Sequence, residues 1–486
     1  MINKNFFLLG ILLLSARLSA QNEIDALRYS QIQLGGTTRS LSMGNAFGAL
    51  GGDFSVLSTN PAGIAIYRKS EVMGTIGFFN NSTSATHFGN KVNDSKYNLN
   101  ISNIGWIANL NSNSSGWTNT CFGIGYNRIN NFNKRFTFQG TNDNSSLLDV
   151  FLDQLNANGG IDAANIGDNP DFTFGTNLAW QTFLLDTAGG ATNYYSALPV
   201  YGELQQGSVI SNGNMGETVI SFGSTYEYKL YVGGSIGIES VNYFEESNYQ
   251  EFAPEGDTNI YLTSFDLKDK LHTSGVGYNF KFGLIFKPND YFRLGAAIHS
   301  PTFFNLSDKY SSYMTSDFKG GEHYEYSSPT GAFDYQLITP YRAIGSIAII
   351  LGQIGLLSAD YEFIDYSSAR LQSDSYDFIK ETNQINLKYT ATSNVRAGTE
   401  WRFDPFRIRA GYTYFGNSYA SLVDNDNSKQ AFSAGLGFRD KEYYIDLGYI
   451  YTMNSEKYFI YNPDYVDATN LNSNTHNFLL TVGFRY

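Results

Sequence analysis

The residues of this chain that could perform catalysis or bind a metal ion are few and scattered. Among 486 residues there are five histidines and a single cysteine, Cys121. One thiol excludes an internal disulfide and any zinc site built from several cysteines. No two histidines have the spacing of metal ligands, and no serine lies in a nucleophile-elbow motif. The histidines are His87, His272, His299, His323 and His476. We therefore expect no enzymatic activity, no cofactor and no metal.

Two loop segments could be interpreted as a haem site and a calcium site, but for each another interpretation is favoured. Tyr324 and Tyr326 beside His323 could be haem ligands, but an ordinary Tyr-rich surface loop is the favoured interpretation. Asp424 and Asp426 resemble a calcium-binding cluster, although the distal glutamate of an EF-hand is missing. A solvated loop tip explains this pair better.

The composition points to a large β protein. Acidic residues outnumber basic ones by 45 to 32, and the net charge of −13 excludes a protein that coats nucleic-acid phosphates. Charged residues make up 16% of the chain, below the roughly 25% of soluble globular proteins. Aromatic residues also make up 16%, and there are 48 glycines. Such a composition suits a β protein with an apolar, aromatic outer face.

Alternating segments run to the end of the chain. In the last ten residues, apolar side chains alternate with small or polar ones, and the segments 395–403, 406–414 and 443–451 repeat this pattern. The apolar set at the end is Phe478, Leu480, Val482, Phe484 and Tyr486. Alternation with aromatic residues at the strand ends is typical of strands that cross a membrane in a barrel.

The lengths of the connections support the same fold. From residue 71 onward we place about fourteen strands, joined in turn by short turns and long connections, notably 129–216 and 301–336. Barrels of the outer membrane have short periplasmic turns and long extracellular loops. The sequence therefore predicts an all-β fold, a transmembrane antiparallel β-barrel over 71–486 with these two segments as long extracellular loops.

The first residues predict export. Lys4 precedes nine uncharged residues at 6–14, and Ser19 and Ala20 resemble a cleavage site. Nine apolar residues are too few to span a bilayer, which takes roughly 20. We expect residues 1–20 to be a signal peptide and the mature chain to reach the outer membrane of a Gram-negative bacterium.

Residues 21–70 do not alternate, and we expect them to form a plug inside the barrel. Their glycines permit tight turns and close packing, and Pro61 keeps Asn60 out of a helix. A phosphate-binding loop is excluded because no Gly-Lys-Ser/Thr follows the glycines. The candidate gating residues are Gly44, Asn45, Asn60, Pro61, Ala62 and Gly63.

Segments 39–53, with Gly-Asn-Ala-Phe, and 60–63, Asn-Pro-Ala-Gly, resemble the N-terminal hatch of the FadL family. This family transports long-chain fatty acids and other hydrophobic compounds across the outer membrane. The resemblance implies a 14-stranded barrel closed by the hatch, with passive uptake through an apolar lumen pocket and a lateral exit. The expected partners are hydrophobic small molecules and membrane lipid. The composition is similar to that of Bacteroidetes members.

A second function is compatible with this resemblance. Some Bacteroidetes relatives act in type IX secretion, where they carry protein substrates to a surface attachment complex. A wide apolar route from the lumen to the barrel wall would favour transport, whereas a sealed lumen would favour such a scaffold. A surface enzyme would need an extracellular catalytic cluster, which the sequence does not offer.

The long connection 129–216 contains two stripes of apolar residues with helical spacing. Two short helices could hold an alkyl chain above the barrel mouth, or they could pack against each other and cover it. Both interpretations remain open. The candidate surface groove comprises Leu148, Phe151, Leu152, Leu155, Trp180, Phe183 and Leu184.

Charged residues occupy the inward positions of two adjacent predicted strands. Rows of Arg and Glu can pair across strands and hold the plug, and this structural role is favoured over binding of a substrate carboxylate by one arginine. The lumen charges are Arg396, Glu400, Arg402, Arg407 and Arg409.

Overall fold

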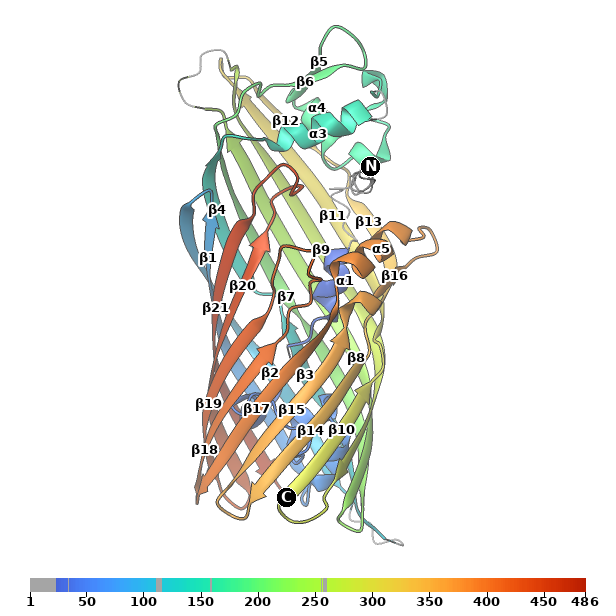
Figure 1. Ribbon diagram of the computed structural model, residues 1–486, viewed down its shortest axis with the longest axis vertical. Helices are drawn as coiled ribbons and strands as arrows, with labels where there is room; N and C mark the ends of the chain where they lie inside the picture. Colours follow the sequence, from blue (N-terminus) through green and yellow to red (C-terminus); the bar gives the residue numbers. More distant parts are fainter. Residues whose placement is uncertain (1–22, 34, 111–115, 158–159, 255, 257–259) are drawn as a thin grey trace, which may run out of the picture.

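Fourteen antiparallel strands of the described residues close into a barrel around an N-terminal plug (Figure 1). The ring is closed by the pairing of β21 (Thr469–Arg485) with β1 (Glu71–His87). This confirms the predicted barrel and plug. The structure, a computed structural model, describes residues 23–33, 35–110, 116–157, 160–254, 256 and 260–486. The predicted signal peptide at 1–20 and a predicted turn at 111–115 lie outside these residues.

Ten of the fourteen strands are uninterrupted in the described part of the chain. Besides β1 and β21 they are β2 (Asn90–Asn109), β7 (Glu203–Tyr226), β8 (Leu230–Phe252), β9 (Leu262–Phe286), β17 (Ala391–Phe403), β18 (Phe406–Phe415), β19 (Lys429–Arg439) and β20 (Tyr443–Tyr458).

Four strands are broken into two pieces. Pro301 and Pro340 lie in two of the breaks, where a missing backbone N–H interrupts the ladder. The pieces are β3 (Trp117–Asn131) with β4 (Lys134–Asn142), β10 (Phe292–His299) with β11 (Phe303–Phe318), β14 (Arg342–Leu351) with β13 (Gly331–Ile338), and β15 (Gly355–Asp365) with β16 (Arg370–Gln372).

One predicted loop is mostly strand. Segment 301–336 contains β11, β12 (His323–Ser327) and part of β13, which pair with each other and with β9. The reason is that the alternation of β11 continues beyond the length that a bilayer needs, so the sheet extends past it. This corrects the expectation of a long loop there. Segment 129–216 likewise contains β4 and half of β7.

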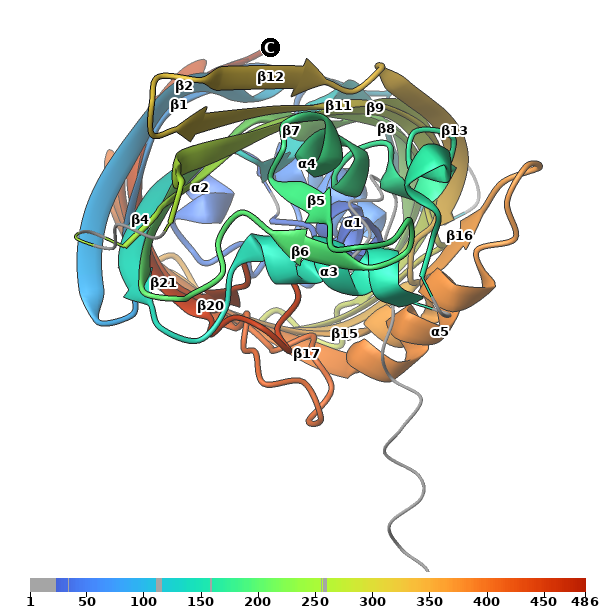
Figure 2. The same ribbon diagram turned by 90° about the horizontal axis from the view of Figure 1, so that it is seen from above.

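The remainder of 129–216 forms a cap over one end of the barrel (Figure 2). It holds helices α3 (Leu147–Asn156) and α4 (Thr176–Gln181), the short turns η4 (Ala163–Asn165) and η5 (Pro170–Phe172), and the hairpin β5 (Leu185–Thr187) and β6 (Tyr194–Ser196). We call this the cap end, and the opposite end, where short turns join the strands, the turn end. The connection between β15 and β17 also holds η6 (Tyr366–Ser368) and α5 (Ile379–Lys388), and Lys388 of α5 pairs with Glu23 of the plug at 2.6 Å. None of the helices in the described residues has the length and apolar character needed to cross a bilayer.

Apolar side chains cover the outside of the barrel near the turn end, as the alternation predicts. Phe478 and Phe484 are 52% and 56% exposed, whereas Leu479 and Thr481 between them face the lumen and are buried. In the middle of this apolar belt, Leu447 lies opposite Leu436 on one neighbouring strand and Leu480 on the other.

We expect Leu447→Arg to lower the free energy of unfolding by about 2–4 kcal/mol, because it places a charge on the lipid face near the middle of the belt. Urea unfolding in lipid bilayers measures this. Leu422→Arg is the control, since Leu422 is 69% exposed in the connection after β18 and lies outside the belt. Equal effects of the two changes would contradict the position of the belt.

Candidate functional site

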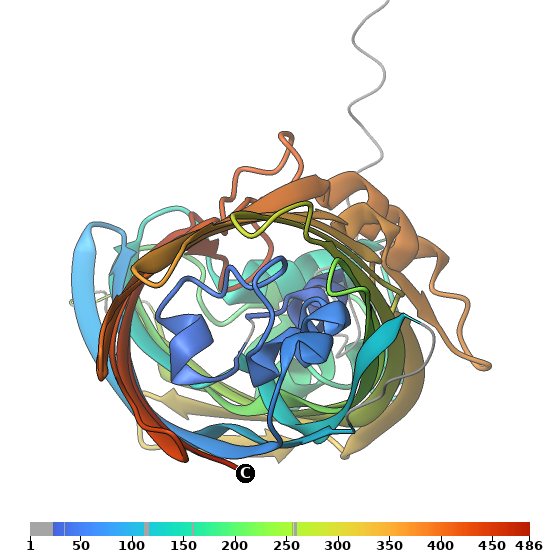
Figure 3. The same cartoon turned by 90° about the horizontal axis from the view of Figure 1, so that it is seen from below.

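The plug, which we call the hatch (residues 23–70), lies inside the barrel (Figure 3). Its elements are α1 (Glu23–Ser30), α2 (Thr38–Leu41), η1 (Phe54–Ser58) and η2 (Pro61–Ile66). Thr37 caps α2 and Asp53 caps η1, and Thr37 Oγ1 donates to the Asp53 carboxylate at 2.8 Å. One polar contact therefore ties the starts of two turns together.

The Asn-Pro-Ala turn is inserted into a wall made of glycine. Asn60 Nδ2 donates to Gly48 O at 2.6 Å within the hatch and to Leu284 O at 3.1 Å on β9. A Cβ atom on Gly283 would lie 1.9 Å from Asn60 Oδ1, and one on Gly233 would lie 2.4 Å from Pro61 O. Neither wall position has room for a side chain, so these glycines allow the turn to touch the wall backbone.

The rest of the turn is equally enclosed. Ala62 is fully buried and its N–H donates to Asn60 Oδ1 at 3.2 Å. Gly63 packs on Gly51, where a Cβ atom would come within 2.9 Å of the Gly51 Cα atom. The predicted gating residues at 60–63 thus lie together at the junction of hatch and wall.

Gly44 and Asn45 form a second contact with the wall, on β17–β19. Both residues have φ of 61°, a left-handed conformation that suits glycine and asparagine. Gly44 N donates to Ser433 Oγ at 3.1 Å, and Thr413 Oγ1 donates to Gly44 O at 2.9 Å. This contact is on a different part of the wall from the Asn-Pro-Ala turn.

A chain of buried ion pairs joins the hatch to the wall near the turn end. Arg39 of the hatch and Arg409 of β18 both donate to the Glu400 carboxylate, at 3.0 and 2.8 Å. Arg409 continues to Asp446 at 2.7 Å, and Arg439 donates to the same carboxylate at 2.8 Å. These groups lie inside the barrel, where an unpaired charge would be costly.

The other predicted lumen charges have separate partners. Arg402 lies at the edge of this chain of ion pairs, with its Nε atom 3.4 Å from Glu400 Oε1. Arg407 pairs with Asp404 in the turn, with Nη2 and Oδ1 2.5 Å apart. Arg396 pairs with Glu362 on β15. The structure therefore brings four of the five predicted residues into ion pairs of the lumen and leaves Arg407 at the rim.

The sequence analysis missed several polar residues that hold the hatch. Lys281 and Ser58 both bind the Glu217 carboxylate, and His299 Nε2 donates to Thr59 O at 2.7 Å. Glu217, Lys281 and His299 are buried on inward-facing positions of their strands, which alternation could have indicated, but no local signal indicates their partners.

The main cavity of the described residues has a volume of about 1420 Å³ and extends from the hatch to the cap. Apolar side chains of the cap and the adjacent wall line one part of it, and amide, hydroxyl and charged groups line the rest. The apolar residues include Phe136, Phe138, Leu147, Val150, Phe151 and Leu267. The polar ones include Asn81, Asn100, Ser102, Thr452, Thr475 and Asn477.

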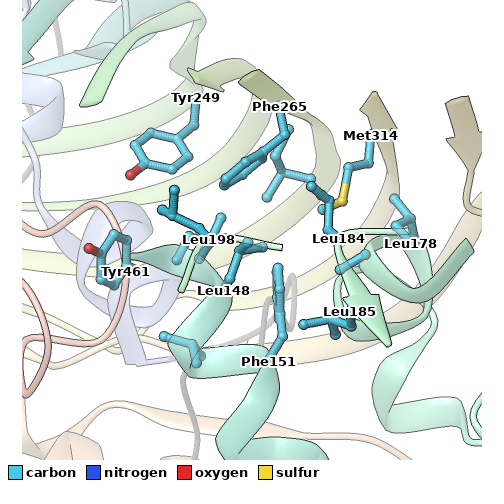
Figure 4. Packing of buried hydrophobic residues seen from close by; sticks show 14 of the residues in the cluster. Leu148, Phe151, Leu178, Leu184, Leu185, Leu198, Tyr249, Phe265, Met314 and Tyr461 are labelled. Atoms are coloured by element: carbon cyan, nitrogen blue, oxygen red, sulfur yellow. The ribbon is translucent and has the colours of Figure 1, made fainter. Parts of the chain in front are cut away.

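Most of the predicted groove residues of the cap pack against the barrel, and Phe183 is the exception. Leu148, Phe151 and Leu184 are buried in one cluster with Tyr249, Phe265 and Met314 of the wall (Figure 4), and Leu155 belongs to the same cluster. Leu152 and Trp180 pack on this cluster, and Phe183 is 58% exposed on the outside against Tyr324. Phe151 is the member of the set that also lines the cavity.

The base of the cap is fixed by a polar group. Ser146 and Asp149 form a capping box on α3, and the Leu147 N–H donates to Glu251 of β8 at 2.8 Å. In the connection after β20, burial and the nearby Glu251 raise the pKa of Tyr461, so its hydroxyl stays neutral and accepts a hydrogen bond from Gln205 at 3.0 Å. The cap is therefore attached to the wall by both apolar and polar contacts.

The barrel wall has a break between β2 and β3. These strands pair only from 103–109 to 121–127, and beyond that point β3 bulges at 128–130 and continues beside β7 as β4. A second cavity of about 480 Å³ lies at the break. It shares the lining residues Asn100, Arg128 and Asn133 with the main cavity, so the two cavities border the same part of the wall.

Arg128 and the start of the hatch lie at this part of the wall. Arg128 donates to Asn98 at 3.2 Å and to Asn131 at 2.8 Å. The hatch runs beside it, with Gln33 N donating to Ile129 O at 2.8 Å. Outside the break, Leu99 and Ile101 are exposed on the lipid-facing side of β2.

Taken together, the fold and the cavities define a plugged β-barrel with an internal cavity. No family model matches the chain, and no curated protein matches it. Among solved structures, a FadL homologue of Pseudomonas aeruginosa has 13% identity and a TM-score of 0.56, covering 93% of this chain and 98% of the other. The Pseudomonas putida toluene transporter TodX has 14% identity and a TM-score of 0.54, covering 93% and 99%. A TodX mutant described as a monoaromatic hydrocarbon channel has 13% identity and a TM-score of 0.54, covering 93% and 100%. The chain thus has the FadL-type fold, which confirms the resemblance at that level.

We expect Gly283→Ala to displace the Asn-Pro-Ala turn and to cost about 1–3 kcal/mol of stability through overpacking. Gly345→Ala is a matched control, because a Cβ atom there meets nothing within 4 Å. The rate of tryptic cleavage within 39–69 and the midpoint of urea unfolding measure the two effects. A hatch as resistant to cleavage in Gly283→Ala as in Gly345→Ala would contradict the inserted position of the turn.

We expect Glu400→Gln to destabilise the protein by about 3–5 kcal/mol, since it leaves the Arg39 and Arg409 guanidinium groups without their shared carboxylate. Asp404→Asn is the control and should cost no more than about 1 kcal/mol, because that carboxylate is 86% exposed. Urea unfolding compares the two proteins, and similar midpoints would argue against the buried chain of charges.

Proposed function

We propose that this protein resides in the outer membrane of a Gram-negative bacterium, after removal of residues 1–20, and takes up hydrophobic compounds passively. Long-chain fatty acids are the proposed substrates. The observation that carries the proposal is that the cavity of about 1420 Å³ shares Asn100, Arg128 and Asn133 with the cavity at the break in the wall between β2 and β3. No step in this function needs a catalytic group or a cofactor.

The proposed route begins at the cap end, on the extracellular side. The apolar side chains beneath the cap bind the hydrophobic part of the compound, with Phe151 of α3 as part of the roof. The hatch (residues 21–70 in the predicted division) blocks the direct path to the turn end, and the contacts at 44–45 and 60–63 keep it in place. The compound then leaves sideways past Arg128 into the membrane.

The lining of the cavity supports an amphiphile over a pure hydrocarbon. An alkyl chain suits the apolar region under the cap, whereas the rest of the lining offers amide, hydroxyl and charged groups that a hydrocarbon cannot satisfy. The solved structures of similar fold are named as transporters or channels of toluene and monoaromatic hydrocarbons. Passage of hydrophobic compounds is common to both possibilities.

A role as a secretion scaffold is the alternative, and uptake measurements separate it from transport. Cells lacking the gene should take up less labelled hexadecanoic acid, and the wild-type gene should restore uptake. Asn100→Trp should restore little, because the indole fills space where the two cavities share lining residues. Asn93→Trp on the outward face of β2 should restore uptake fully.

The amount of folded protein in the membrane is measured in parallel for every variant. Full uptake with Asn100→Trp would contradict the lateral exit. Unchanged uptake after deletion, together with loss of secreted or surface-attached proteins, would remove the transport function and support the scaffold.

A further inference from the structure

The floor of the main cavity contains two buried donor groups without a partner. Arg396 is 2% exposed and Asn45 is 4% exposed, and both line the cavity. Among the described residues, Arg396 Nη1 and Asn45 Nδ2 have no hydrogen-bond partner. An unsatisfied buried donor is costly, and more so when it is charged. Two such groups at the bottom of a cavity indicate a place for a ligand that accepts hydrogen bonds.

The two donors belong to the same corner of the floor. Arg396 lies directly opposite Thr413 in the pairing of β17 with β18. Thr413 Oγ1 donates to the carbonyl of Gly44, the neighbour of Asn45 in the hatch. A Cβ atom on Gly44 would lie 2.9 Å from Ala397 O, next to Arg396 in the chain. One donor therefore comes from the wall and the other from the hatch.

The nearby charges leave Arg396 with capacity for an anion. Arg396 and Arg342 share the Glu362 carboxylate, with Arg342 Nη1 at 3.0 Å from it, so two guanidinium groups face one acid. Asp360 lies opposite Arg396 across β15 and β17, and one of its oxygens accepts the Gly48 N–H at 3.0 Å. Its other oxygen, Oδ1, has no hydrogen-bond partner among the described residues, but no ion pair joins it to Arg396, whose carboxylate partner is Glu362. Glu362 and Asp360 are not among the residues that line the cavity.

We propose that Arg396 and Asn45 form a binding site for the carboxylate of an amphiphile, which we call the floor site. Arg396 Nη1 and Asn45 Nδ2 each donate to the carboxylate, and the alkyl chain points toward the apolar region below the cap. The inference rests on the proposed function and deepens it. It adds the residues that distinguish an acid from a neutral compound of the same length, and it makes the ligand a bridge between wall and hatch.

The test compares the affinities of hexadecanoic acid and hexadecan-1-ol for the purified full-length protein. Wild type should prefer the acid. Arg396→Lys keeps a positive charge for Glu362 but loses the planar fork of donors, and should lower the acid-to-alcohol affinity ratio about tenfold. Asn45→Gly keeps the left-handed backbone without the amide and should lower the ratio about threefold to tenfold. Asn45→Asp adds a like charge and should lower it further.

Arg342→Lys is the matched control, because Arg342 binds the same Glu362, is 7% exposed and does not line the cavity. Its ratio should equal that of wild type. A wild-type ratio in both Arg396→Lys and Asn45→Gly would overturn the floor site and leave the proposed transport intact, as would equal losses in Arg342→Lys and Arg396→Lys. Binding of neither ligand by wild type would overturn the proposed function and the floor site with it.

Discussion

The closed ring of backbone hydrogen bonds is the constraint on which the rest of this structure depends. In lipid, backbone N–H and C=O groups have no water to bind, so a sheet must close on itself. The pairing of β1 with β21 closes the sheet and encloses a lumen. The inner face of the wall then lies against neither lipid nor a continuous hydrophobic core. Period-two alternation then sends polar and charged side chains inward, and these side chains need partners. The hatch supplies many of them.

The wall receives the hatch through two kinds of complementarity. The first is complementarity of shape: glycines such as Gly283 and Gly233 leave room for the Asn-Pro-Ala turn to touch the backbone of the wall. The second is complementarity of charge: inward carboxylates such as Glu400 bind Arg39 of the hatch. The part of the lumen between the hatch and the cap is left open as a cavity, and at its floor Arg396 Nη1 has no hydrogen-bond partner among the described residues. Attachment of the hatch and the proposed ligand binding therefore both depend on inward-facing residues of the wall.

The sequence predicts well which side chains of a strand point outward or inward, and poorly which residues of other strands they contact. Alternation is a local property, so the exposed Phe478 and the buried Thr481 follow from residue types alone. The hatch follows from its glycines and from the resemblance of 60–63 to a known motif. The partners of the lumen charges, such as Asp446 for Arg409, depend on the register of several strands at once and carry no local signal. The break after β3 and the strand content of 301–336 were missed for a related reason: alternation marks a strand but not where it leaves its neighbour or the membrane.

The seam between β1 and β21 also dictates an order of assembly. It joins the first strand of the barrel to the last, so the ring cannot be completed until the final residues of the chain have been synthesised. The hatch precedes β1 and yet contacts the last strand, where its Thr38 N donates to Thr481 Oγ1 of β21 at 2.8 Å. The contacts of the hatch with the last strands can therefore form only after nearly the whole chain has been made, so its final position is fixed late in assembly.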